Sequence, residues 1–210
     1  TDLTTNSYCV TSLNDDNPSD SATWTLRKSV EDANTRAVAS ATIGFQDALF
    51  SAATSSDNAK LVLNSTLEIK TNITITAPTD KDGATLLTIE RGAGIASGEP
   101  LIGVNDKLTP TVSDERGMDT NKATTEVKIE NVTIDSRSNS ATPSDASGVF
   151  SNPGVAIQVK ETIVQTETGE AAVTPTVVLS NTTIKSTVSE TGGAAITTPG
   201  DVTLSNSVLT

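Results

Sequence analysis

Hydrophobic and polar residues alternate in short runs along most of the chain, and polar segments separate the runs. The first such run is ATIGF at residues 41–45; the later ones are LVLNSTLEI, TNITITAP, ATLLTIE, VKIENVTI, VAIQV, VVLSNTTI and VTLSNSVL. In TNITITAP, Ile73 and Ile75 point to one side, and Thr74 and Thr76 point to the other, as in a strand with one buried face. The pattern predicts a series of short strands.

Three of these runs share a template: apolar, variable, apolar, polar, Asn, two variable residues, apolar. The asparagines are Asn131, Asn181 and Asn206; the last two are 25 residues apart and the first two are twice that. VAIQV, from Val155, falls midway and would supply the missing copy without its asparagine. A period near 25 residues with two or three strands in each copy is typical of a solenoid. Asparagine at one recurring corner tolerates a left-handed backbone and could form a hydrogen-bonded ladder.

The segment TWTLRKSVEDANT, residues 23–35, has a different period. Leu26, Val30 and Ala33 fall at i, i+4 and i+7, which is the spacing of one apolar helix face. We expect a helix at about residues 25–36. The first coil of a strand stack exposes its interior and its unpaired edges, so it requires a cap. The helix is predicted to cover that end of the stack.

The charge of the chain restricts its partners and its chemistry. It has 14 Lys+Arg against 26 Asp+Glu, a net charge of −12, and no histidine. Nucleic acid and anionic membrane surfaces are therefore not expected as partners. Without histidine, catalysis would depend on carboxylates, Lys, Arg or hydroxyl groups. No apolar run is long enough to span a bilayer, so no membrane insertion by this segment is expected.

Two long polar segments, residues 105–123 and 136–154, are predicted to be loops that project from the stack, and a shorter one begins at Gln165. Carboxylates that share a site could perform acid/base chemistry. Asp135, however, stands where a strand is expected to end, and an aspartate there commonly stabilises the turn. We predict no catalytic residue, cofactor or metal site. The charged residues closest to a ligand-binding set are Asp114, Glu115, Arg116, Asp135 and Arg137.

Several residues have both a structural and a functional interpretation. Asp80 and Asp82 in TDKDG have the spacing of a calcium loop but lack its further ligands, so a solvated turn is expected and calcium binding is left open. Asparagines of four Asn-x-Ser/Thr sequons stand where the strand template already requires asparagine, and their glycosylation is left open. These are Asn64, Asn72, Asn131 and Asn181.

The few aromatic and sulfur-containing side chains are assigned mainly structural roles. Cys9, the only cysteine, is expected on one face of a strand, with a reactive thiol as the alternative. Trp24 and Tyr8 could mark a binding platform, but packing of Trp24 over the end of the core is expected. Arg27 is expected to bond with the chain locally.

Residues 10–45, VTSLNDDNPSDSATWTLRKSVEDANTRAVASATIGF, resemble the N-terminal motif of right-handed parallel β-helix (pectate-lyase-like) proteins. That motif is a strand, an Asp/Gly-rich loop, Leu-Arg-x-Ala-Ile-x-x-Ala-Asn and a strand ending in Ile-x-Phe. Ser29 replaces the usual Ala, and the Cys that often precedes Leu-Arg is absent. The matching residues are Leu26, Arg27, Val30, Ala33, Asn34, Ile43 and Phe45.

The resemblance implies an all-β, right-handed parallel β-helix with an N-terminal capping helix. We expect one domain over residues 1–210, with a cap at 1–58 and coils at 59–210 that continue further. About six coils would form a rod of about 30 Å.

Proteins of this family include autotransporter passengers, adhesins and polymorphic outer membrane proteins. The implied function is that of a bacterial adhesin, secreted or displayed at the cell surface on the outer membrane or a fimbria. It would be a monomeric part of a longer protein, binding a glycan or a cell-surface receptor through its side face and loops. The alternatives are a polysaccharide lyase or esterase, and a structural stalk.

Overall fold

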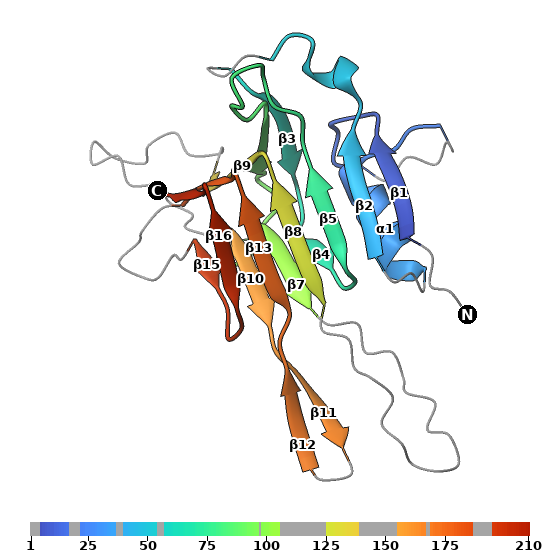
Figure 1. Ribbon diagram of the computed structural model, residues 1–210, viewed down its shortest axis with the longest axis vertical. Coiled ribbons are helices and arrows are strands. Elements are labelled where there is room, and N and C mark those ends of the chain that lie inside the picture. The colour runs from blue at the N-terminus through green and yellow to red at the C-terminus, as the bar shows by residue number, and fades with distance from the viewer. Residues whose placement is uncertain are drawn as a thin grey trace.

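The computed structural model describes residues 5–16, 22–36, 40–53, 57–96, 98–105, 125–138, 155–166, 169–186 and 195–210 (Figure 1). About half of these residues lie in strands, and most of the strands form parallel sheets. This part of the chain contains one α-helix, α1 (Leu26–Thr35), and one 3-10 helix, η1 (Asp47–Phe50). The predicted combination of serial strands with a single helix is confirmed.

Three parallel sheets take one strand each from successive turns of the chain. The first sheet has the order β1 (Thr5–Val10), β2 (Ser40–Phe45), β5 (Ile73–Thr76), β8 (Glu126–Glu130), β13 (Thr176–Ser180) and β16 (Val202–Ser205). The second has the order β3 (Ala59–Leu63), β6 (Leu87–Arg91), β9 (Val132–Ser138), β14 (Thr183–Lys185) and β17 (Val208–Leu209). The third has the order β4 (Leu67–Ile69), β7 (Ile102–Asn105), β10 (Ile157–Lys160) and β15 (Ile196–Thr197).

From β2 onward the chain visits the first, second and third sheets in a fixed cycle. Each strand lies in register on the strand one turn earlier, so that equivalent side chains stack. In the first sheet one such column is Ile43, Ile75, Ile129, Leu179 and Leu204. All of these except Leu204 are fully buried. Aliphatic side chains of successive turns therefore stack in a buried column.

The predicted 25-residue period, and with it the count of six coils, is wrong for most of the chain. β8 and β13 begin 50 residues apart, at Glu126 and Thr176, yet they are adjacent strands of the first sheet. VAIQV contributes β10 to the third sheet, so it is the last strand of the Asn131 turn and not another copy of it. The described residues make four complete three-strand turns and then β16 and β17. Six strands in the first sheet span about 24 Å.

The three template asparagines occupy the corner between the first and second sheets. Asn131, Asn181 and Asn206 have φ angles of +60°, +47° and +48°, in the left-handed region that asparagine tolerates. Asn131 Nδ2 donates to the Ala77 carbonyl at 3.1 Å, and Asn181 Nδ2 donates to Asn131 Oδ1 at 3.0 Å. The predicted ladder of asparagine side chains is confirmed between Asn131 and Asn181, and the two bonds occupy the amide groups of two of the sequons.

Two substitutions at Asn131 separate the backbone effect from the ladder. Asn131→Gly permits the positive φ but removes the amide, so we expect the free energy of unfolding to fall by about 1 kcal/mol. Asn131→Ala removes the same amide but keeps a Cβ in the left-handed region, without the side-chain hydrogen bonding that lets asparagine adopt it, so it should cost about 1–2 kcal/mol more than glycine. Urea denaturation of both variants measures the difference. Equal losses for the two variants would show that the backbone conformation does not limit the choice of residue here.

Helix α1 packs with its apolar stripe toward the interior. Leu26, Val30 and Ala33 are fully buried, as the spacing predicts. The Thr25 hydroxyl accepts a hydrogen bond from Lys28 N at 3.1 Å and caps the N-terminus of the helix. The helix contacts β1, β2 and β4 and lies behind β1 and β2 in Figure 1.

Side chains of α1 bond the edge of β4, the outermost strand of the third sheet. Asn34 Nδ2 donates to the Glu68 carbonyl at 2.7 Å, and its Oδ1 accepts from Lys70 N at 2.8 Å. One amide side chain thus supplies both bonds that a neighbouring strand would make. Arg27 Nη2 donates to the Ser65 carbonyl at 2.7 Å. The predicted capping role of the helix is confirmed at this edge.

The third polar segment, predicted to be a loop, is instead a β-hairpin. β11 (Thr162–Thr166) pairs antiparallel with β12 (Gly169–Val173), and the hairpin projects from the sheets in Figure 1. The register places Thr166 opposite Gly169 and Thr162 opposite Val173. The two longer predicted loops fall mostly in residues 106–124 and 139–154, outside the described residues.

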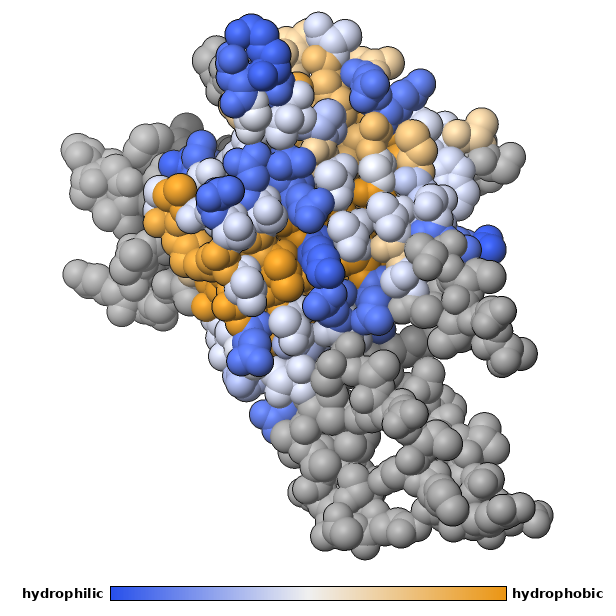
Figure 2. Space-filling model, in the orientation of Figure 1, coloured by the Kyte–Doolittle hydropathy of each residue, from blue (hydrophilic) through white to orange (hydrophobic). Residues whose placement is uncertain are grey.

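The last rung of the stack leaves apolar side chains at the surface. Leu204, Val208 and Leu209 are exposed by 45%, 52% and 46%, whereas equivalent residues one turn earlier are more buried. Figure 2 shows hydrophobic residues gathered over the C-terminal strands and hydrophilic residues along β8.

Candidate functional site

Asp135 and Arg137 lie within β9, so the expected strand exit is wrong, but Asp135 Oδ1 accepts from Arg137 N at 3.1 Å, which is the bond of an Asx turn. The pairing of β6 and β9 shifts register after Glu90, and β9 continues to Ser138. Arg137 Nε lies 2.7 Å from Asp135 Oδ1, and Arg137 Nη2 also bonds the second carboxylate oxygen. Hydrogen bonding to Asp135 raises the pKa of Arg137. The two residues form a bidentate pair with each other.

A second ion pair lies beside this one on the outer face of the second sheet. Glu90 is the register partner of Asp135, and Lys60 Nζ lies 2.9 Å from Glu90 Oε1. Hydrogen bonding to Glu90 raises the pKa of Lys60. The carboxylate side chains are only 8% and 15% exposed, and those of Lys60 and Arg137 are 59% and 38% exposed. Because the cations cover the carboxylates, the cluster has the features of a structural ion-pair network.

The other charged residues singled out in the sequence do not form a site in the described structure. Asp80 Oδ1 accepts from Asp82 N at 2.9 Å and from Ala84 N at 2.8 Å, which is an Asx turn. Asp82 is exposed and pairs with Lys81, so the solvated turn is confirmed. Among the described residues no three His, Cys, Asp or Glu side chains form a cluster suited to a metal ion. Asp114, Glu115 and Arg116 lie outside those residues.

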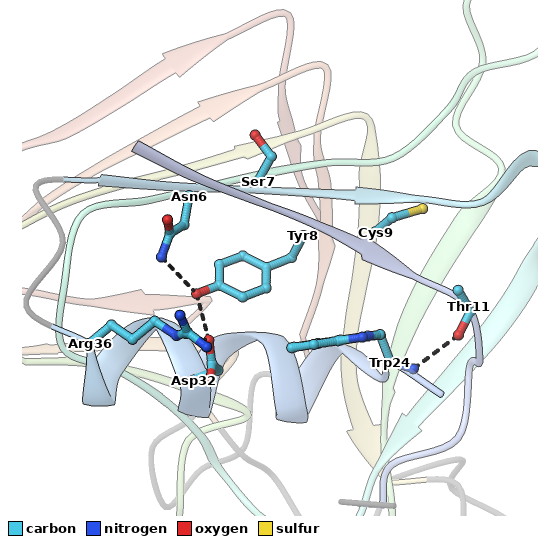
Figure 3. A pocket seen from close by; sticks show the side chains of 8 residues that line it. All are labelled: Asn6, Ser7, Tyr8, Cys9, Thr11, Trp24, Asp32 and Arg36. Carbon is cyan, nitrogen blue, oxygen red and sulfur yellow. Dashed lines mark hydrogen bonds and ion pairs between the residues drawn. The ribbon is translucent and has the colours of Figure 1, made fainter. Parts of the chain in front are cut away.

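The first strand and the helix enclose a groove of about 460 Å³ at the N-terminal end of the stack (Figure 3). Asn6 and Tyr8 of β1 are the register partners of Ala41 and Ile43, so they occupy core-side positions in the outermost strand. No earlier strand of the described chain covers them. The groove is lined by Asn6, Ser7, Tyr8, Cys9, Thr11, Trp24, Asp32 and Arg36.

The helical side of the groove follows a spacing that the sequence already contains. Trp24 directly precedes the helix and its cap, and Lys28, Asp32 and Arg36 follow at intervals of four residues. Of these four residues, all but Lys28 line the groove. Residues four apart form one ridge of a helix. This second stripe is the signal that could have revealed the site, but its partner residues in β1 become apparent only when the strand is placed beside the helix.

Aromatic and charged groups meet inside the groove. The ring centroids of Tyr8 and Trp24 are 5.5 Å apart, with planes inclined by 51°, and Lys28 Nζ lies 5.0 Å from the Trp24 ring centroid. The Tyr8 hydroxyl donates to Asp32 Oδ2 at 2.8 Å, and Arg36 Nε lies 2.5 Å from the same oxygen. Figure 3 shows Arg36 and Trp24 toward opposite ends, with Tyr8 between them.

Trp24 and Cys9 agree only in part with their expected structural roles. The Trp24 backbone is anchored, because its carbonyl accepts from Thr11 N at 2.7 Å and its N–H donates to Thr11 Oγ1 at 2.9 Å. The indole packs against Tyr8, which in turn packs against the core, but it is only half-buried and also lines the groove. Cys9 lies in a strand, as expected, with an exposed thiol.

Titration of Tyr8, the only tyrosine, tests the contact with Asp32. Burial and the hydrogen bond to Asp32 raise the pKa of Tyr8 above its usual 10. Because the folded-state pKa is the higher one, the associated stability is fully present below pH 10 and is lost as the pH rises through the folded value. Absorbance at the tyrosinate wavelength should give a midpoint above 10, lowered by Asp32→Asn. A wild-type midpoint at or below 10 would contradict the contact.

Comparison with known proteins adds no relative: no family model, no curated protein and no solved structure matches this chain. No helix in the described part of the chain is long and apolar enough to cross a membrane. The candidate site therefore rests on its own geometry, which combines an aromatic pair with hydrogen-bonding and charged groups in one open groove.

Proposed function

We propose that the chain is part of a bacterial exported protein with a right-handed parallel β-helix fold, and that it acts as an adhesin that binds glycans at a cell surface. The cyclic visits to three parallel sheets and the helix over one end support this fold. The residues that resemble the family motif support it as well, because Leu26, Val30 and Ala33 are buried in the cap.

The groove between β1 and α1 is the observation that carries the binding role. Small-molecule sites combine apolar and aromatic surface with a few polar groups that orient the ligand. Here Tyr8 and Trp24 offer ring surface for the C–H face of a sugar, and Asn6, Asp32 and Arg36 offer donors and acceptors for its hydroxyl groups. The volume of about 460 Å³ accommodates a single sugar residue.

The ion pairs on the second sheet are easier to reconcile with a binding protein than with an enzyme. An acid/base pair needs carboxylates that a substrate can reach, at split pKa values. Glu90 and Asp135 are instead covered by Lys60 and Arg137. We therefore propose that this face of the protein stabilises the fold.

Glycan-array screening followed by titration of the best ligand tests the proposal. We expect Trp24→Ala and Tyr8→Ala each to weaken binding about tenfold or more, as for buried aromatic anchors. Trp24→Phe, which keeps an aromatic ring, should retain most of the affinity. Thr203→Ala, at an exposed position of β16, serves as the control and should bind like the wild type.

Two results would contradict different parts of the proposal. Failure of the wild type to bind any glycan or any cell surface would remove the adhesin function and favour a structural stalk. Undiminished glycan binding by a folded Tyr8→Ala/Trp24→Ala double variant would keep the adhesin function but place its site elsewhere, on the side face or the loops.

A further inference from the structure

The side chains that line the groove between β1 and α1 offer a ligand no excess charge. Asp32 and Arg36 are the charged residues of its lining, and they pair with each other. Asp32 Oδ2 also accepts the hydrogen bond of the Tyr8 hydroxyl at 2.8 Å. A charged ligand would therefore compete with a pair that is already formed, whereas an uncharged one can use the ring surface of Tyr8 and Trp24.

Two residues of β1 border the groove through their main chain. Ser7 and Cys9 belong to its lining, yet Figure 3 shows their side chains pointing away from α1, while those of Asn6 and Tyr8 point toward it. Both residues are exposed. The groups that Ser7 and Cys9 present to the groove are therefore their backbone N–H and C=O groups.

The hydrogen bonds of β1 show which way these main-chain groups point. The Val10 carbonyl accepts from Gln46 N at 2.9 Å, so it points toward β2. The main-chain groups of successive residues in a strand point to opposite sides, so those of Cys9 and Ser7 point away from β2. No strand of the described chain pairs with β1 on that side. Ser7 and Cys9 thus form a row of donors and acceptors at an open strand edge.

The chain itself occupies the next position of this row. Thr11 N donates to the Trp24 carbonyl at 2.7 Å, and Trp24 N donates to Thr11 Oγ1 at 2.9 Å. Trp24 therefore lies beside the same edge of the chain, in the place of a neighbouring strand. The chain then turns into α1 and does not continue along Ser7 and Cys9. An extended segment could follow the row from Trp24 toward Asn6.

We propose that β1 accepts an extended, uncharged peptide segment of a partner protein as an additional strand of the first sheet. Ser7 and Cys9 offer it two N–H and two C=O groups over about 7 Å of strand edge. One apolar side chain of the segment lies on the rings of Tyr8 and Trp24. In strand addition of this kind, main-chain bonds supply the affinity and pockets for alternate side chains supply the specificity.

This inference does not rest on glycan binding. A bound segment would cover the rings of Tyr8 and Trp24, so the peptide and the proposed glycan would exclude each other. The net charge of −12 opposes an acidic partner at long range, so the flanks of the segment are expected to be neutral or basic.

The experiment titrates the full chain with the peptide acetyl-Lys-Thr-Val-Thr-Val-Thr-Lys-amide and with two N-methylated forms of it. One form is methylated at the valine nitrogens and the other at the threonine nitrogens. Valine and threonine main-chain groups point to opposite edges of the extended peptide, so one set can face β1. One methylated form should bind about tenfold more weakly, and the other should bind like the unmodified peptide. In NMR, the amide protons of Ser7 and Cys9 should exchange more slowly with bound peptide.

Two substitutions at one position test the protein side. Ser7→Pro removes the N–H that faces the open edge and keeps the bonds to β2, as proline is tolerated in an edge strand. It should weaken binding of the unmodified peptide about tenfold, with an unchanged circular dichroism spectrum. Ser7→Ala is the matched control, since it keeps the N–H, and should bind like the wild type.

Three results would overturn the inference. They are failure of the unmodified peptide to bind, equal affinities of the two methylated forms, and an equal loss of affinity in Ser7→Ala and Ser7→Pro. The methylated peptides decide the question on the wild-type chain even if Ser7→Pro fails to fold. Glycan binding is measured separately on the array, so the failure of either ligand leaves the other standing.

Discussion

Replacing Arg91 with methionine is expected to lower the free energy of unfolding by about 3–5 kcal/mol. Arg91 is the last residue of β6 and is fully buried. Its guanidinium donates only to main-chain carbonyl groups, which come from three separate segments of the chain. The acceptors are Ser136 at 3.0 Å, Ala96 at 3.3 Å, Val155 at 3.5 Å, and Glu99.

The loss of stability is large because the substitution removes the donor while its acceptors stay in place. A buried ion pair can often be exchanged for two apolar residues, but here the partners are backbone groups that remain after the substitution. Methionine fills most of the volume but donates no hydrogen bond. The Ala96 and Val155 carbonyl groups keep Glu99 N and Leu101 N as donors, so the loss falls mainly on the carbonyl groups of Ser136 and Glu99, at about 1–3 kcal/mol for each buried one. Burial lowers the pKa of Arg91, but an arginine remains charged at any pH the fold tolerates.

Urea denaturation measures the effect, with Arg137→Met as the matched control. Arg137 is 38% exposed and pairs with one carboxylate, so its loss should cost less than about 1 kcal/mol. Arg91→Lys, which keeps the charge but not the planar fork, should fall between the two. A cost below about 1 kcal/mol for Arg91→Met would mean that water replaces the guanidinium and that the residue does not hold these segments together.

Replacing Asp15 with alanine is expected to be nearly as severe, at about 3 kcal/mol. The Asp15 side chain is 2% exposed and pairs with Arg27, at 2.7 Å from Oδ1 to Nε. Its second oxygen accepts from Asn64 N at 2.6 Å, just beyond β3. Alanine leaves Arg27 in a largely enclosed position without a counter-charge, although Arg27 also holds the Ser65 carbonyl. The variant should therefore loosen α1 from the edge that it covers.

Two measurements follow this substitution. Thermal or urea unfolding gives the change in stability, and light scattering reports association through the uncovered edge of β4. Asp82→Ala is the matched control, since its carboxylate is 72% exposed and pairs with exposed Lys81. It should change stability by less than about 0.5 kcal/mol. If the two aspartate variants behave alike, the contact between Asp15 and Arg27 does not secure the cap.

The sequence predicts the elements of this fold better than their spacing. Alternation identifies the strands, and the buried stripe of α1 identifies the cap, because both patterns follow directly from which face meets the core. The asparagine template marks one corner only. The segment that leads from one such corner through the third sheet to the next corner can become longer without changing the corner itself. The 50 residues from Asn131 to Asn181 therefore form one turn, whereas the sequence pattern predicts two.

Buried charges and the groove depend on contacts between distant parts of the chain. Arg91 stands in IERG, where the local pattern gives no sign that distant carbonyl groups surround it. Asp15 is one of several acidic residues in a polar stretch, and only the fold distinguishes it from the exposed ones. The groove needs both the ridge of α1 and the inward side chains of β1, and no periodicity in either segment joins them.

The bonds between α1 and β4 have a consequence for the way the chain acquires its fold. A rung gains most of its free energy from the rung already beside it, so a bare strand has no stable state of its own. At the capped end, Asn34 already makes both bonds of a neighbouring strand to β4, and Leu26, Val30 and Ala33 are buried there. Folding should therefore nucleate where α1 meets β4 and propagate rung by rung away from the helix, in the order in which the ribosome releases the chain.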